Sequence, residues 1–205
     1  MVGLAGLLLV GLLVGVALLI AYTAWALSHP PRRTYATALA SGRPGDPGEL
    51  TPPLAFTDLQ LSSGGRRFST WDVAGGDPAG PLLVLVHGWG DSRIGALSRI
   101  ETLAPVASRL IALDLPGHGD SPGASTQGAT EAGVVLDLLT EVMHPSRGVA
   151  SEERRPVVLF GWSMGAGVAL HAAVESAARG LDVHGVVAEA PYRLPETPAK
   201  RMLIS

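Results

Sequence analysis

The stretch VVLFGWSMGAGVALHAA, residues 157–173, decides the fold. It passes from a short β-branched apolar run, through two glycines that flank a Trp-Ser-Met triplet, into an alanine-rich segment with helical character. The spacing G-x-S-x-G at 161–165 sets small residues two before and two after the serine, so that a strand and a helix can pack around a sharp turn. Such a turn also places Ser163 at a helix N-terminus, where free N–H groups favour developing negative charge. The pattern therefore predicts a nucleophile at Ser163.

Strand-like and helix-like segments alternate on both sides of this stretch. Continuous apolar runs are typical of strands that are buried on both faces of a parallel sheet, and an apolar face repeating every three to four residues predicts a helix. We predict a hairpin at 55–61 and 67–73, buried strands at 81–88, 109–115, 156–161 and 183–190, and helices at 94–108, 131–143 and 164–178. This alternation indicates an α/β fold, a mostly parallel sheet with helices on both faces.

Composition excludes several classes of protein. The 205 residues carry a net charge of −3 and no long basic run, so nucleic acid is not an expected partner. The chain has no cysteine, which rules out disulfides, cysteine nucleophiles and thiolate metal sites.

Residues 1–28 form the first predicted unit, a transmembrane anchor. They contain no Asp, Glu, Lys, Arg or His, and a helix of that length exceeds a hydrocarbon core of roughly 30 Å. A secretory signal peptide has a basic start and a shorter apolar core, although Ala24-Trp25-Ala26 resembles a cleavage site, and a secreted form is the alternative. Because Arg32 and Arg33 are the nearest basic residues, the positive-inside rule favours a cytoplasmic main domain on a single-pass membrane protein.

Residues 29–53 form the second unit, a linker rich in proline and glycine. The composition predicts an extended segment that holds the domain off the membrane surface. The third unit, 54–205, is the α/β domain.

Ligands of parallel sheets bind beyond the carboxyl ends of the strands, and glycine-rich loops are expected there. The loop His87–Ser92, HGWGDS, can bring the backbone N–H of Trp89 close to Ser163. Together with the N–H of Met164, it would form a two-donor oxyanion hole. His87 and His118 are interpreted as bracing their loops rather than as bases, and Asp114 as orienting backbone in the loop that follows it.

Three motifs in order, HGWGDS, DLPGHGDS and GWSMGAG, resemble the α/β-hydrolase superfamily over residues 54–192. The resemblance implies a serine nucleophile at Ser163, an oxyanion hole from the N–H groups of Trp89 and Met164, and no metal or cofactor. The triad order in that family is serine, then an acid, then histidine. The resemblance also implies a small acyl or ester substrate, and the apolar stretch at 201–204 suggests the start of a lid over an apolar acyl group.

The base that activates Ser163 is not found. His171 lies two turns into a helix, and His184 starts a strand at the wrong edge of the sheet. Glu189 lies near a carboxyl strand end and is the candidate acid. We therefore expect the chain to be the front part of a longer hydrolase, lacking its last strands, with the strand at 183–190 as a bare edge.

The leading hypothesis is a membrane-anchored serine hydrolase that acts on an ester or related acyl bond. One alternative is an α/β-hydrolase-like module that binds a ligand without catalysis, which the missing histidine motivates. A second alternative is an acyltransferase, which would use the same residues with another acyl acceptor.

Overall fold

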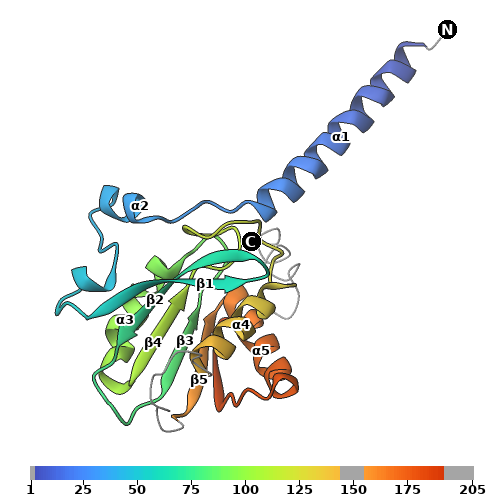
Figure 1. The fold of residues 1–205 in the computed structure, drawn as a ribbon. Coiled ribbons are helices and arrows are strands. Elements are labelled where there is room, and N and C mark those ends of the chain that lie inside the picture. Colours follow the sequence, from blue (N-terminus) through green and yellow to red (C-terminus); the bar gives the residue numbers. More distant parts are fainter. Residues whose placement is uncertain (1–2, 144–154, 192–205) are drawn as a thin grey trace.

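The computed structural model describes residues 3–143 and 155–191. They form a long N-terminal helix and an α/β domain joined by a short connecting segment (Figure 1). Helix α1, Leu4–Ser28, has 25 residues, and none of them is buried. A helix of this length and composition meets the criteria for crossing a membrane, which a signal sequence meets as well.

The connecting segment packs on the domain, contrary to the prediction of an extended linker. It contains helix α2, Tyr35–Ala40, and the 3₁₀ turn η1, Pro47–Glu49. The Thr37 hydroxyl fixes the start of α2, since it accepts from the Thr34 N–H at 2.9 Å and donates to the Thr34 carbonyl at 2.7 Å. Leu50 is buried in the core together with strand residues, so this apolar side chain ties the segment to the sheet.

Six strands form one sheet in the described part of the chain, in the order β1-β2-β4-β3-β5-β6. Strands β1 and β2 are the predicted hairpin, β2 pairs antiparallel with β4, and the remaining pairs are parallel. Val86, the last residue of β3, stands opposite Leu113 of β4 and Gly161 of β5, so the parallel strands end at one common edge. The strands are β1 Phe56–Ser63, β2 Arg66–Ala74, β3 Leu82–Val86, β4 Arg109–Leu113, β5 Val157–Trp162 and β6 Gly185–Glu189.

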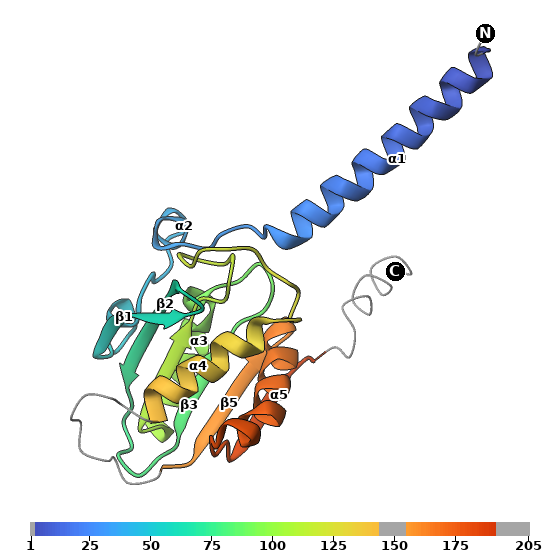
Figure 2. The ribbon, with the colours of Figure 1, turned by 45° about the vertical axis from the view of Figure 1, so that its right-hand side comes forward.

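Helices cover both faces of the sheet, as the alternation predicts. Figure 2 shows α4, Glu131–Met143, and α5, Met164–Ser176, together on one face. Helix α3, Leu97–Leu103, packs on the other face with its own apolar core. The 3₁₀ turns η2, Arg93–Ala96, and η3, Ala104–Val106, flank α3, and η4, Ala177–Arg179, follows α5.

The single helix expected at 94–108 is therefore wrong, because its two ends are 3₁₀ turns. Pro105 stands in η3 and cannot donate a backbone hydrogen bond, which ends the α-helical pattern. The expectation of an edge strand is confirmed for the described residues, since β6 pairs there with β5 alone and leaves Val187 45% exposed.

Candidate functional site

Ser163 is the single residue that connects β5 to α5. Its φ of 53° and ψ of −121° lie in a region that residues with a side chain rarely adopt. The residue is exposed, and its hydroxyl makes no hydrogen bond with a described residue. Such strain persists only where the surroundings impose it, and it is concentrated at functional sites. The local geometry is that of a nucleophile presented at the end of a strand.

Two glycines make this turn possible by allowing backbone to meet backbone. A Cβ on Gly161 would clash with the carbonyl of Gly165 across the turn. A Cβ on Gly165 would clash with the carbonyls of Val86 and His87, at the end of the neighbouring strand β3. The helix thus begins in direct contact with the loop that carries the proposed hole, which explains the small residues of the motif.

The predicted oxyanion donors come from the loop after β3 and from the first residue of α5. A Cβ placed on Gly88 would lie 3.1 Å from the Cβ of Ser163, so the loop after β3 runs beside the serine. Trp89 follows Gly88, and Met164 is the first residue of α5. Neither the Trp89 N–H nor the Met164 N–H donates to another group in the described part of the chain. Two free donors next to a serine suit a developing oxyanion.

His87 and His118 brace the loops from inside. The Nδ1 of His87 lies 2.8 Å from the carbonyl of Gly88, and its Nε2 accepts from the N–H of Leu115 at 2.9 Å. The Nδ1 of His118 lies 3.0 Å from the carbonyl of Pro116, and the two imidazoles meet edge to face at 4.9 Å. Both rings are fully buried, so neither is placed to take a proton from the exposed Ser163.

Acid should destabilise the fold through this pair. Burial lowers the pKa of His87 and of His118 to about 4, against about 6.5 in the unfolded chain. The unfolded state then binds more protons, so stability is complete above pH 6.5 and falls as the pH drops toward 4. We expect a loss of about 2 kcal/mol per histidine between pH 7 and 5, measured by denaturant unfolding.

The control for this prediction is a pair of variants. His118→Asn should show a shallower pH dependence than the wild type, by about that amount, whatever its stability at pH 7. His171→Gln, at an exposed position, should keep the wild-type slope. An unchanged slope in His118→Asn would show that the buried ring does not couple folding to pH.

Asp114 organises the loop after β4, as the sequence indicated. Its carboxylate accepts from the backbone N–H of Arg93 at 2.6 Å and of Asp120 at 2.9 Å, and pairs with the Arg93 guanidinium. Burial raises the pKa of Asp114, and Arg93 opposes that shift. The guanidinium also lies over the Trp71 ring, 5.0 Å from its centroid. The cluster stabilises the loop without reaching Ser163.

Glu189 ends β6 at the same sheet edge as Ser163, and its carbonyl accepts from the Ser163 N–H at 2.9 Å. Its carboxylate is paired side by side with Arg99 of α3, at 2.7 and 3.0 Å. That guanidinium covers the ring of Trp162, 4.1 Å from the centroid. The acid candidate is thus near the serine by its backbone, while its side chain has a cationic partner.

The remaining histidines after the serine lie where the sequence predicted. His171 is exposed on α5, and His184 accepts from the Val157 N–H at the start of β5. Sequence reasoning did not single out Arg99, because its partner is 90 residues away. The stretch 201–204, interpreted as the start of a lid, lies outside the described residues.

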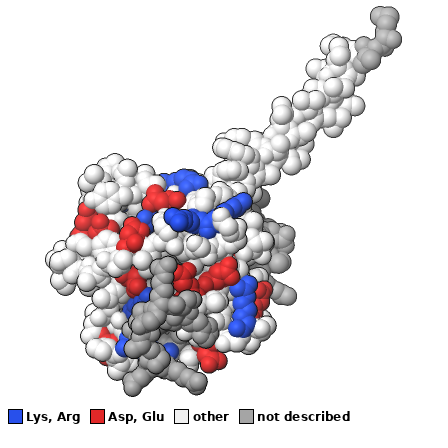
Figure 3. Space-filling model, viewed as in Figure 1, with Lys and Arg blue, Asp and Glu red and all other residues white. Residues whose placement is uncertain are grey.

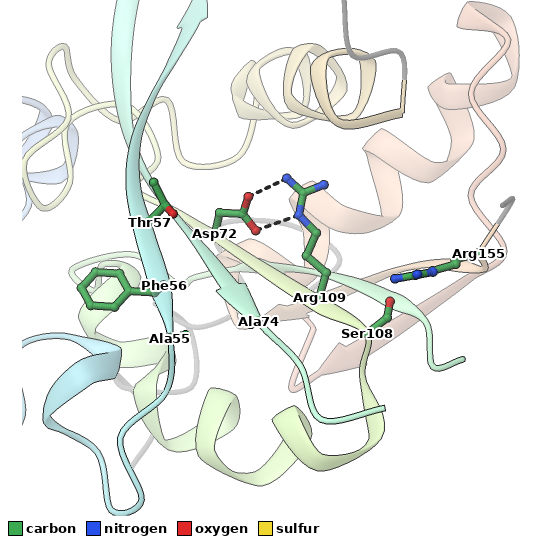
Figure 4. A pocket seen from close by; sticks show the side chains of 8 residues that line it. All are labelled: Ala55, Phe56, Thr57, Asp72, Ala74, Ser108, Arg109 and Arg155. Carbon is green, nitrogen blue, oxygen red and sulfur yellow. Dashed lines mark hydrogen bonds and ion pairs between the residues drawn. The ribbon is translucent and has the colours of Figure 1, made fainter. Parts of the chain in front are cut away.

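A hollow of about 340 Å³ lies at the end of the sheet opposite to Ser163. Figure 4 shows the ion pair of Asp72 and Arg109 at its wall, with a shortest distance of 2.6 Å. Arg109 is the first residue of β4, whereas Ser163 follows the last residue of β5. The hollow therefore lies at the amino ends of the parallel strands, whereas Ser163 lies at their carboxyl ends. Within residues 3–143 and 155–191, no cluster of His, Asp or Glu would hold a metal ion.

Residues 83–204 match the model of a protein family described as "Alpha/beta hydrolase family". Among curated proteins, the mouse "Protein phosphatase methylesterase 1" is 34% identical over 100 residues, which is 46% of this chain and 24% of that protein. The "Pimeloyl-[acyl-carrier protein] methyl ester esterase" of Methylococcus capsulatus is 39% identical over 95 residues, covering 46% of this chain and 32% of the esterase. The human "Protein ABHD12B" is 30% identical over 126 residues, which is 60% of this chain and 32% of that protein.

Among solved structures, an esterase of Pyrococcus furiosus, Pf2001, superposes with a TM-score of 0.67 at 22% identity. The match covers 85% of this chain and 64% of the esterase, and it supports the fold. The chain spans about a quarter to a third of the length of the curated relatives named above.

Proposed function

Since the chain belongs to the alpha/beta hydrolase family, we propose that it is a membrane-anchored serine hydrolase that cleaves an ester or related acyl bond. The observation that carries the proposal is the strained and exposed Ser163, with the N–H groups of Trp89 in the loop after β3 and of Met164 at the start of α5 making no hydrogen bond in the described residues. Relatives named as esterases and a methylesterase support ester hydrolysis as the reaction class. A purely binding module would have no need of a serine held at φ 53°.

The chemistry proposed for Ser163 has two halves. Its Oγ forms a bond to the acyl carbon, the carbonyl electron pair moves to oxygen, and the Trp89 and Met164 N–H groups hold that oxyanion. The serine proton passes to a base. The electron pair on the oxyanion then re-forms the carbonyl, the bond from the acyl carbon to the alcohol oxygen breaks, and the base gives its proton to the leaving alcohol. Water next attacks the acyl carbon of the acyl-enzyme while the same base takes its proton. The tetrahedral species collapses with cleavage of the bond to Oγ, the base returns the proton to Oγ, and the acid product leaves.

We assign the base to none of His87, His118, His171 and His184. The first two are buried, and the other two lie away from Ser163. Glu189 keeps its candidacy as the acid on position alone. To act so, its carboxylate would exchange Arg99 for a histidine. The simpler role supported by the contacts is to fix β6 against α3 beside Trp162.

Helix α1 is proposed as the membrane anchor. Its 25 residues are long enough to cross a bilayer, and Arg32 and Arg33 just beyond it favour a cytoplasmic domain. Cleavage after Ala26 and secretion is the alternative. The mass of the polypeptide in its source cells distinguishes the two, since cleavage removes the apolar helix.

A serine-directed fluorophosphonate tests the function on the polypeptide isolated from its source cells. We expect covalent labelling of Ser163, located by mass spectrometry of the digest, because phosphonylation requires an activated hydroxyl. A folded protein that binds ligands without labelling would contradict the proposal and favour the non-catalytic binding module. Labelling together with acyl transfer to an alcohol in preference to water would favour the acyltransferase.

A further inference from the structure

The C-terminal end of α1 is docked on the domain. The last carbonyls of a helix lack partners inside the helix and must find them elsewhere. Here the carbonyl of Leu27 accepts from the Trp89 indole N–H at 2.8 Å and from the Gln127 amide at 2.5 Å. The carbonyl of Ser28 accepts from the backbone N–H of Ser125 at 2.8 Å. These three donors hold the helix end at one place on the domain.

That place is the edge of the sheet that carries Ser163. Trp89 donates to the helix through its side chain, and its backbone N–H is the first of the two proposed oxyanion donors. The second loop reaches the other donor: the Ser125 hydroxyl lies 3.8 Å from the sulfur of Met164. A Cβ on Gly128 would lie 3.6 Å from the Met164 side chain. Both flanks of the serine are thus in contact with loops that hold the helix.

The two arginines that follow α1 extend this docking. Arg32 donates to the carbonyls of Gly119 and Ser121, at 3.0 and 2.8 Å, in the loop after β4. Arg33 pairs with Asp91 at 3.1 Å, in the loop after β3. Figure 1 shows α1 leaving the domain from this edge, and Figure 3 shows basic side chains beside the base of an uncharged helix.

The position of the bilayer along α1 then sets the depth of the site. A hydrocarbon core of roughly 30 Å takes about 20 residues of helix, so a core that begins near Leu4 leaves the last turn of Leu4–Ser28 among the headgroups. Trp25 lies in this turn and stacks on Tyr22, one turn before it. Tyr and Trp are the residues enriched at membrane interfaces. Leu27 lies about 3 Å further along the axis than Trp25. The loops bonded to Leu27 are therefore at headgroup level.

We infer that the Ser163 edge faces the bilayer surface and that the substrate is an ester whose acyl chain lies in the bilayer. The inference rests on the proposed function and on α1 spanning the membrane. An amphiphile with a polar head and an acyl chain holds its ester group at the boundary between them, which is the depth reached by these loops. The notion of a linker that holds the domain away from the membrane is not compatible with these contacts.

The first test uses the absence of cysteine from the chain. Ala129→Cys and Ala79→Cys each place one thiol at an exposed loop alanine, the first at the Ser163 edge and the second at the opposite edge. Each is labelled with a fluorophore, reconstituted as full chain in phosphatidylcholine vesicles, and exposed to lipids that carry a nitroxide on the headgroup. We expect Ala129→Cys to lose roughly half its fluorescence and Ala79→Cys almost none, since a strand length of about 17 Å separates the edges.

Two variants check that the docking contacts set this orientation. Arg32→Ala combined with Gln127→Ala removes three of the hydrogen bonds and should weaken quenching at Ala129→Cys. Arg43→Ala, an exposed arginine of the same connecting segment, should leave it unchanged. Equal quenching of the two edges in the undisturbed chain would overturn the orientation, and with it the inference.

The second test concerns the substrate and uses the polypeptide from its source cells. A fluorogenic long-chain ester is placed in the same vesicles as the protein or in separate vesicles, beside a water-soluble short-chain ester. We expect the long-chain ester to be hydrolysed at least tenfold faster when it shares the vesicle, and the short-chain ester equally in both arrangements. Equal rates on the long-chain ester would overturn the inference and leave the hydrolase intact. No hydrolysis of either ester, with no phosphonate labelling, would overturn the proposed function instead, while the quenching still reports the orientation.

Discussion

Ser163→Ala is expected to lower kcat/KM for ester hydrolysis by at least about 10³-fold in the polypeptide as its source cells produce it. The substitution removes the oxygen that forms the acyl-enzyme and leaves the backbone donors in place. Oxyanion-hole and binding effects alone preserve only a small residue of the rate enhancement. The measurement is steady-state hydrolysis of a fluorogenic ester, with the variant's thermal unfolding recorded alongside.

Ser98→Ala provides the matched control. Ser98 is exposed on α3, outside the loops that surround Ser163. We expect Ser98→Ala to keep the wild-type rate and the phosphonate label, because only the serine at the strained turn is activated. A Ser163→Ala protein that unfolds normally and still hydrolyses the ester at the wild-type rate would show that another group is the nucleophile.

The strands and the nucleophile turn could be predicted because their signals are local. The residues 82–86 are all buried, and a run of apolar side chains with no polar interruption is the direct consequence of cover on both faces. The turn at Ser163 is likewise predictable from the two glycines that lie two residues before and after it. A side chain at either position would collide with backbone atoms. The α4 helix, Glu131–Met143, has the predicted bounds because its apolar face repeats within the helix itself and is therefore also a local signal.

The contacts that connect the helix, the linker and the site could not be predicted, since each joins residues far apart in the chain. Trp89 and Leu27 are 62 residues apart, and Gln127 and Leu27 are 100 apart. The pair of Arg99 and Glu189 spans 90 residues. Short polar segments take their conformation from such partners rather than from their own propensity. The proline and glycine content of 29–53 reports only local propensity, and it therefore predicted an extended linker.

Gly165→Ala is expected to destabilise the domain by about 3 kcal/mol. Alanine is a better helix former than glycine, so propensity alone predicts a gain of up to about 1 kcal/mol inside α5. The packing predicts the opposite, because the added methyl group meets the carbonyls of Val86 and His87, which are backbone atoms and cannot rotate away. Relieving the contact requires that the start of α5 move from β3, which also shifts Ser163 relative to the Trp89 N–H.

Gly167→Ala is the matched control for this prediction. Gly167 lies two residues further along the same helix, and nothing lies within 4 Å of a Cβ added there. There the propensity gain is unopposed, and we expect stabilisation by up to about 1 kcal/mol in denaturant unfolding of the detergent-solubilised chain. Two identical substitutions in one helix should thus change stability with opposite signs. If both stabilise the protein, α5 does not touch the end of β3 as described. The close strand-to-helix contact that presents Ser163 would then be wrong, and with it the reason for a glycine at 165.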